Sequence, residues 1–253
     1  MASFVVAVDG SDGSVEALRW AIDMAEVHDA TLTAVTAWSW LDQPEELAFS
    51  ATYTEDDARS ELEATVKATL GDRPPGRMAP IAARVVNDLP VPGLQSAAEG
   101  ADLLIVGARG HGGFASLRVG SVSERLLESS PCPIAVVHAA APVKGGRVVV
   151  GVDASATSHA ALRWAAAEAA ARDADLDVVQ AWSLPVSVAA PYDDGVVDLD
   201  LYESGERQLL SEALAEPTLA EVRVTAHLVT GGAARALLER ADGAALVVVG
   251  SRG

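Results

Sequence analysis

Glycines and serines between residues 107 and 123 form the stretch whose residue types best suit chemistry. The run reads G-A-R-G-H-G-G-F-A-S-L-R-V-G-S-V-S, so Gly107 and Gly110 precede Gly120 and Ser121. Glycines after a strand let the backbone approach a ligand closely, and free N–H groups in the first turn of a following helix can hold an anion. The spacing predicts a phosphate-binding loop. A glycine-rich turn that only reverses the chain is the alternative.

Such a loop needs a strand before it and a helix after it, and the hydrophobic pattern indicates both. Leu103–Val106 is continuously apolar, which is typical of a parallel strand buried on both faces, and Val122–Leu127 has helical spacing. The other expected strands are Phe4–Val8, Thr31–Trp38, Ile81–Val86 and Ile134–Val137, and the other expected helices are Val15–Ala25 after a Ser14 cap, Glu55–Leu70 and Leu94–Glu99.

Strands that alternate with helices imply a parallel sheet with crossovers, hence a doubly wound α/β fold. In such sheets, ligands bind beyond the carboxyl ends of the strands, where the strand order reverses. Asp9 follows the first expected strand and Gly107 follows the fourth. We therefore expect the two residues at the same edge of the sheet.

The chain repeats itself with an offset near 144 residues. Val148–Asp153 repeats the first strand and its aspartate, and Leu246–Gly253 repeats Leu103–Gly110. We predict two tandem copies of a doubly wound, five-stranded, Rossmann-like domain with a parallel sheet. The first copy covers residues 1–140 and the second covers residues 147–253.

The second copy is incomplete in this sequence, because the sequence stops at Gly253, the counterpart of Gly110. Counterparts of residues 111–137, which include the last helix and strand, do not follow. We expect a shortened chain rather than a second copy that departs from the first, because a duplication that ends within the motif leaves a sheet edge uncovered.

Composition limits the location and the partners of the protein. Half of the 253 residues are apolar, but no apolar run is long enough to span a membrane. The N-terminus lacks the features of a signal peptide, and the single Cys132 excludes an intrachain disulfide, so we expect a cytoplasmic protein. A net charge of −18 argues against a nucleic-acid surface. Backbone N–H groups can still hold a small phosphate ligand.

The sequence resembles a tandem universal stress protein of the subclass that carries the ATP-binding pattern G-x2-G-x9-G-[ST]. The pattern is reproduced without a gap by Gly107, Gly110, Gly120 and Ser121. Asp9 in D-G-S and the closing segment Ser130–Val137 also match. The resemblance covers all of the first copy and about the first two-thirds of the second.

The resemblance implies an ATP site. Asp9 would hydrogen-bond the nucleotide near its ribose, Ala7 would line the adenine pocket, and Ala37 would offer backbone groups to the adenine edge. The implied loop residues are Gly107, Arg109 and Gly110 around the ribose and phosphates, and Gly120, Ser121, Val122 and Ser123 as N–H and hydroxyl donors to the phosphates. The matching positions in the second copy are Gly151, Asp153, Ala181, Gly250, Arg252 and Gly253. That copy lacks the phosphate-binding half and is expected to bind nucleotide weakly or not at all.

The resemblance also implies the function. We expect ATP, with Mg2+, as a signal in a regulator of stress response or dormancy that acts on an unknown protein partner. The glycine loop has no evident catalyst, so fast turnover is not expected. A slow ATPase or phosphotransferase and a nucleotide-free scaffold are the alternatives. Family members pair their domains through the fifth strand, which implies domain pairing within this chain and a homodimer.

Rival motifs are absent or weak. The first turn lacks G-x-G-x-x-G and the chain lacks G-x4-G-K-[ST], so dinucleotide and P-loop sites are unsupported. The histidines share no metal-ligand spacing, and no metal centre is expected. Cys132 is expected to pack as a small hydrophobe, and the acids of Asp193–Glu206, which lack EF-hand spacing, to form a solvated loop and helix start. Trp38 and Trp182 end the second strands, where packing is the default and covering the base is the alternative.

Overall fold

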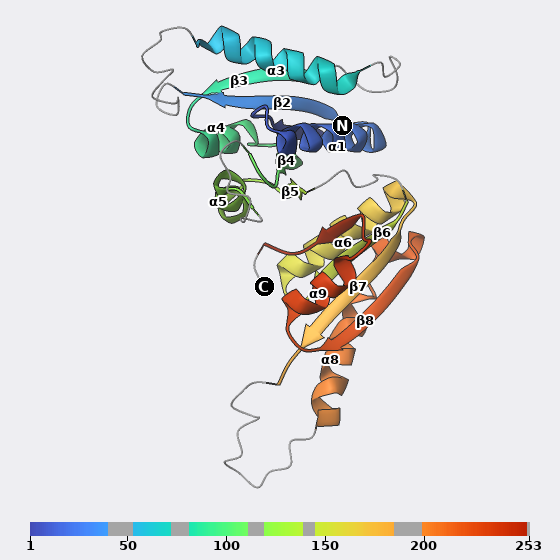
Figure 1. The fold of residues 1–253 in the computed structure, drawn as a ribbon. Coiled ribbons are helices and arrows are strands. Elements are labelled where there is room, and N and C mark those ends of the chain that lie inside the picture. Colours follow the sequence, from blue (N-terminus) through green and yellow to red (C-terminus); the bar gives the residue numbers. More distant parts are fainter. Residues whose placement is uncertain (40–52, 72–80, 111–118, 139–144, 185–198, 252–253) are drawn as a thin grey trace, which may run out of the picture. The chain divides into compact units, whose positions relative to one another are not determined.

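The computed structural model describes residues 1–39, 53–71, 81–110, 119–138, 145–184 and 199–251. The chain divides into two compact units, Met1–Ala141 and Pro142–Gly253, and each unit is considered by itself (Figure 1). Among the described residues, no helix combines the length and the apolar character that crossing a membrane requires.

The first unit alternates strands and helices as the hydrophobic pattern predicts (Figure 1). Its elements are β1 (Ser3–Ala7), α1 (Asp12–His28), β2 (Thr31–Trp38), α3 (Glu55–Leu70), β3 (Ala82–Asn87), α4 (Pro90–Ala97), β4 (Leu103–Gly107), α5 (Ser121–Ser129) and β5 (Ile134–Val137). The parallel strands lie in the order β3-β2-β1-β4-β5. The strand order therefore reverses between β1 and β4.

The second unit has the same order of elements as far as its fourth strand. It contains β6 (Arg147–Val152), α6 (Ala156–Arg172), β7 (Asp175–Trp182), α8 (Leu199–Ala213), the 3-10 helix η2 (Pro217–Glu221), β8 (Val224–Thr230), α9 (Ala233–Ala241) and β9 (Leu246–Val248). Its described strands are parallel in the order β8-β7-β6-β9. Two tandem parallel-sheet α/β units confirm the predicted fold class.

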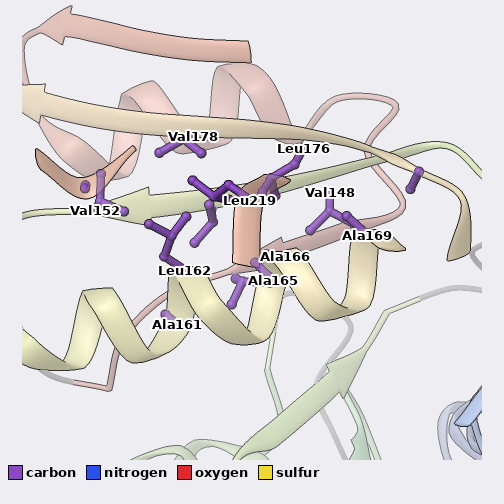
Figure 2. Close-up of a cluster of buried hydrophobic side chains, with 14 of the residues drawn as sticks. Val148, Val152, Ala161, Leu162, Ala165, Ala166, Ala169, Leu176, Val178 and Leu219 are labelled. Carbon is purple, nitrogen blue, oxygen red and sulfur yellow. The ribbon is translucent and has the colours of Figure 1, made fainter. Parts of the chain in front are cut away.

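Small side chains let α6 pack closely on its sheet. Figure 2 shows Leu162, Ala165 and Ala166 of α6 facing the valines and leucines of β6 and β7. Leu162 and Leu176 are fully buried, as are the two alanines. Burial of apolar surface at about 25 cal/mol per Å2 makes this contact a main source of stability for the unit. Because the helix axis is fixed here, the start of α6 at the carboxyl end of β6 is fixed too.

Two helix starts differ from the sequence prediction. Ser14 was expected to cap the first helix, but Ser11 is the cap, and its side chain accepts a hydrogen bond from the Ser14 N–H. Both serines suit the position, and the local sequence does not choose between them. Helix α4 begins at Pro90 instead of after the prolines, because the N–H of a residue in the first turn makes no hydrogen bond within the helix, so proline is tolerated there.

The two units differ beside their fourth strands, at the edge of the sheet where β5 lies in the first unit. In the first unit, α5 and β5 cover β4, and Leu104 and Val106 are at most 2% exposed. Their counterparts in the second unit, Val247 and Val249, are 40% and 59% exposed. Counterparts of α5 and β5 are not among the described residues of the second unit. Within the described part of the chain, the helix that follows the glycine loop is thus seen in the first unit, and residues 111–118 of the loop lie outside the described residues.

Candidate functional site

The carboxyl ends of β1 and β4 lie side by side and bring the two halves of the candidate site together. A β-carbon at Gly107 would lie 2.6 Å from the Gly13 carbonyl oxygen, and one at Gly110 would collide with Asp9 Oδ2. The first turn of α1 therefore packs directly on the backbone that leaves β4. This contact needs glycine at both loop positions, and it places Asp9 beside Gly110 as the fold predicts.

Ser11 holds the Asp9 carboxylate. Its backbone N–H and its hydroxyl both donate to Asp9 Oδ1, at 3.0 and 2.5 Å. The same hydroxyl oxygen accepts from the Ser14 N–H at 3.3 Å. Its one hydrogen goes to Asp9, because the Arg109 carbonyl oxygen lies farther away, at 3.5 Å. The Ser14 hydroxyl in turn accepts from the Asp9 N–H at 3.3 Å. The carboxylate is thus oriented before any ligand arrives.

The N-terminus of α5 lies at the other side of the loop. The cap residue Gly120 makes no side-chain hydrogen bond, as is also true at the starts of α4 and α9, whereas Ser11 caps α1 and Thr54 caps α3. The described residues provide no recorded hydrogen-bond acceptor for the N–H groups of Ser121, Val122 and Ser123. The first N–H groups of a helix are donors without an intrahelical partner, and they carry the positive end of the helix dipole. An anion can be held here.

Two groups expected to donate to the phosphates are used within the protein instead. The Gly120 N–H donates to the Ala108 carbonyl at 2.6 Å, and the Ser123 hydroxyl donates to the Gly107 carbonyl at 2.7 Å. A hydroxyl has one hydrogen to donate, and Ser123 is only 5% exposed. In the structure these two groups are engaged within the protein, and their expected role toward a phosphate stays a prediction. The three helix amides remain as donors.

Ala7 and Ala37 lie near the carboxyl ends of β1 and β2 and are half-buried. Both pack against the apolar cluster that includes Leu94 of α4 and Leu126 of α5. Trp38, at the end of β2, is 8% exposed, which agrees with its expected packing role. Arg109, in contrast, has an exposed side chain beside the loop.

The second unit repeats the β1 half of the arrangement. The Ser155 N–H and hydroxyl donate to Asp153 Oδ1 at 3.0 and 2.6 Å, and the Ser158 N–H donates to the Ser155 hydroxyl. A β-carbon at Gly250 would lie 3.2 Å from Thr157 Oγ1, a looser contact than at Gly107. Two of the remaining predicted positions, Gly151 and Ala181, lie near Leu237 of α9. The other two, Arg252 and Gly253, lie outside the described residues.

The hydrogen bond from Ser155 lowers the pKa of Asp153 below its ordinary value, although partial desolvation acts in the opposite direction. The lowered pKa means that this interaction stabilises the unit above the unfolded-state pKa of about 3.9 and is lost as the pH falls through the folded-state pKa. Ser155→Ala should raise the pKa of Asp153 and reduce the pH dependence of stability below about pH 4. An NMR titration of the Asp153 carboxyl carbon measures this, and an unchanged pKa would contradict it.

Sequence reasoning missed three residues that shape the site. These are Ser11, Gly13, on which the loop backbone packs, and Thr36, whose hydroxyl donates to the Val8 carbonyl at 2.6 Å. The spacing D-x-S-x-x-S occurs in both copies and could have identified Ser11.

Cys132 is half-buried beside the same apolar cluster, and burial raises the pKa of its thiol. Within the described ranges, no three metal-binding side chains gather.

The fold and the site define a protein of two tandem doubly wound units, the first of which brings Asp9, Gly110 and the start of α5 together beyond its strands. Matches to the model of the "Universal stress protein family" cover residues 1–138 and 146–253. The chain belongs to the universal stress protein family. It is 33% identical over 264 residues to Universal stress protein Rv2623 of Mycobacterium tuberculosis, a match covering 98% of this chain and 86% of the relative. A universal stress protein of Mycolicibacterium smegmatis is 32% identical over 259 residues, with the same coverage.

Solved structures share the fold. A universal stress protein from Archaeoglobus fulgidus matches with a TM-score of 0.59 at 20% identity, over 95% of this chain and 82% of that one. A putative universal stress protein from Pseudomonas aeruginosa matches with a TM-score of 0.61 at 18% identity, over 98% and 81% of the two chains. At this level of identity the likeness establishes the fold alone.

Proposed function

We propose that the first unit binds ATP with Mg2+ at the carboxyl ends of β1 and β4, and that the bound nucleotide acts as a regulatory signal. The observation that carries the proposal is the uncapped start of α5, where the N–H groups of Ser121, Val122 and Ser123 meet a glycine loop. A phosphate at such a helix start gains about 0.3–1 kcal/mol from the dipole at an exposed site.

The space at the loop supports the same proposal. A β-carbon at Gly120 would lie 3.5 Å from the Ala108 carbonyl oxygen and 3.7 Å from the Gly110 nitrogen, which are ordinary contact distances. The backbone that leaves β4 and the start of α5 therefore approach each other closely at Gly120, with no side chain of that residue between them. A phosphate group placed here would meet backbone donors on the helix side.

Asp9 supports the proposal from the β1 side. Its carboxylate is held by Ser11 and lies against Gly110, so it can accept hydrogen bonds from the hydroxyl groups of a sugar. Mg2+ would offset the repulsion between adjacent phosphates, because the helix amides supply dipoles rather than full charges. Arg109 is an exposed cation at the same loop.

Calorimetric titration of the 253-residue chain with Mg-ATP tests the proposal. We expect one nucleotide per chain, because the sequence contains one complete glycine motif. GTP serves as the control for base recognition, and mass spectrometry of ligand released on denaturation identifies any nucleotide that co-purifies. A chain that neither retains nor takes up ATP would contradict the proposal and favour the scaffold alternative. ADP release at many turnovers per minute would instead favour the enzyme alternative.

A further inference from the structure

The Ser123 hydrogen bond connects the two ends of the glycine loop. Ser123 is the third residue of α5, and Gly107 is the last residue of β4. The pairing of β1 with β4 ends at Val6 and Ile105, so Gly107 lies beyond the part of β4 that β1 pairs with. The Ser123 hydroxyl supplies a partner for the Gly107 carbonyl. A buried carbonyl without a partner would cost about 1–3 kcal/mol.

Among the described residues, few other directional contacts hold α5 in place. Of its residues, Ser123 and Leu126 alone are buried. The Gly120 N–H bond to Ala108 closes the base of the loop, and at the far end the Gln95 side chain donates to the Ser129 carbonyl at 2.8 Å. Leu126 packs in the apolar cluster but has no directional bond through its side chain. Val122 of the first turn packs half-buried against the same cluster. Within the described residues, Ser123 therefore supplies the side-chain hydrogen bond that ties the first turn of α5 to the sheet.

We propose that Ser123 is a positioning residue for the phosphate-binding amides of α5, an inference that rests on the proposed ATP site. Its hydroxyl holds the N–H groups of residues 121–123 in place before the ligand binds. Preorganised donors spare the ligand the cost of ordering them, so loss of the tie lowers affinity without removal of any group that touches the ligand. The family pattern pointed to a hydroxyl that touches phosphate, whereas the geometry assigns it to the fold beneath the site.

A positioning role predicts an effect that depends on the phosphates. Adenosine has no phosphate and makes no use of the α5 amides, so its affinity should not change when Ser123 is altered. ATP uses the amides and should bind more weakly. A purely structural role would weaken both ligands by the same factor, because it would loosen the whole unit.

The test measures ATP and adenosine binding by the full chain in three variants. Ser123→Ala removes the hydroxyl, and we expect ATP affinity to fall about tenfold, the effect of one buried hydrogen bond. Ser123→Thr keeps a hydroxyl and should restore most of the affinity. Ser129→Ala is the matched control, because it removes an exposed serine hydroxyl from the same helix, where it bonds to the Arg125 carbonyl. Amide hydrogen exchange of residues 120–126 without ligand should be faster in Ser123→Ala alone.

Two results would overturn the inference while the ATP site stands. One is wild-type ATP affinity in a folded Ser123→Ala chain, and the other is an equal loss of ATP and adenosine affinity. A wild-type chain that binds no ATP would remove the proposed function, and this inference with it. Unchanged hydrogen exchange in Ser123→Ala would separately show that the hydroxyl does not hold the helix start.

Discussion

Gly120→Val should abolish measurable ATP binding by the first unit while leaving that unit folded. Gly120 has a φ of −77° and a ψ of 157°, a backbone conformation that valine adopts readily. Its β-carbon would make ordinary contacts with Ala108 and Arg109, so the protein itself accommodates it. The methyl groups would then occupy the space proposed for a phosphate. We expect affinity to fall at least about 100-fold, which corresponds to about 2.8 kcal/mol.

The second unit offers a matched control for this variant. Gly232 is the residue before α9, has a similar backbone conformation, with a φ of −75° and a ψ of 135°, and has no neighbouring atom near its would-be β-carbon. Gly232→Val should leave both the fold and ATP binding unchanged. Calorimetric titration gives the affinities, and circular dichroism on heating shows whether each variant is folded. ATP affinity close to wild type in folded Gly120→Val would refute the phosphate position.

Gly107→Ala should destabilise the first unit by about 1–3 kcal/mol, the usual effect of overpacking a close contact. The new β-carbon would lie 2.6 Å from the Gly13 carbonyl oxygen and 3.0 Å from the Ser14 nitrogen. Both are backbone atoms at the start of α1 and cannot rotate away. The first turn of α1 must therefore shift, and Asp9 with it, so we expect weaker ATP binding as a second effect.

Gly250→Ala provides the comparison for this stability effect. At this equivalent position, the nearest atoms to an added β-carbon belong to Thr157 and Ser158, at 3.2 and 3.3 Å. A shift of a few tenths of an ångström relieves such contacts, so the loss should be less than half of that for Gly107→Ala. Native-state hydrogen exchange of peptides from β1 and β6 reports on the two units separately. Equal losses in the two variants would show that the contact at Gly107 is not the tighter one.

The two units share the aspartate side of the candidate site. The aspartate and its serine clamp are present in both, with nearly identical hydrogen bonds at Ser11 and Ser155. The start of α5 is described in the first unit, whereas residues 111–118 of the loop lie outside the described residues. Nucleotide titration with the Gly120→Val chain also examines this difference, because any ATP that still binds would have to be held elsewhere.

Hydrophobic periodicity and repetition predicted most of the fold. Thr31–Trp38, Glu55–Leu70 and Ile134–Val137 have the bounds that the pattern predicts. These segments are long or bounded by strong signals, and their burial follows directly from their own residues. The duplication could also be predicted, because detecting it requires only a comparison of the sequence with itself. The glycine motif and the family resemblance suggested ATP, which stays a prediction.

The sequence alone thus determined the α/β class, the tandem organisation and the family, together with the residues that gather at the carboxyl ends of the strands. Only the tertiary structure decided which groups there are free to bind. Ser11 rather than Ser14 caps α1, and the backbone that leaves β4 packs against Gly13. The Ser123 hydroxyl donates its hydrogen to the Gly107 carbonyl. The physical reason is that a hydrogen bond or a close contact depends on atoms that come from distant positions in the chain. A motif shows which type of hydrogen-bond donor is present, but the packing of distant residues determines which acceptor it binds.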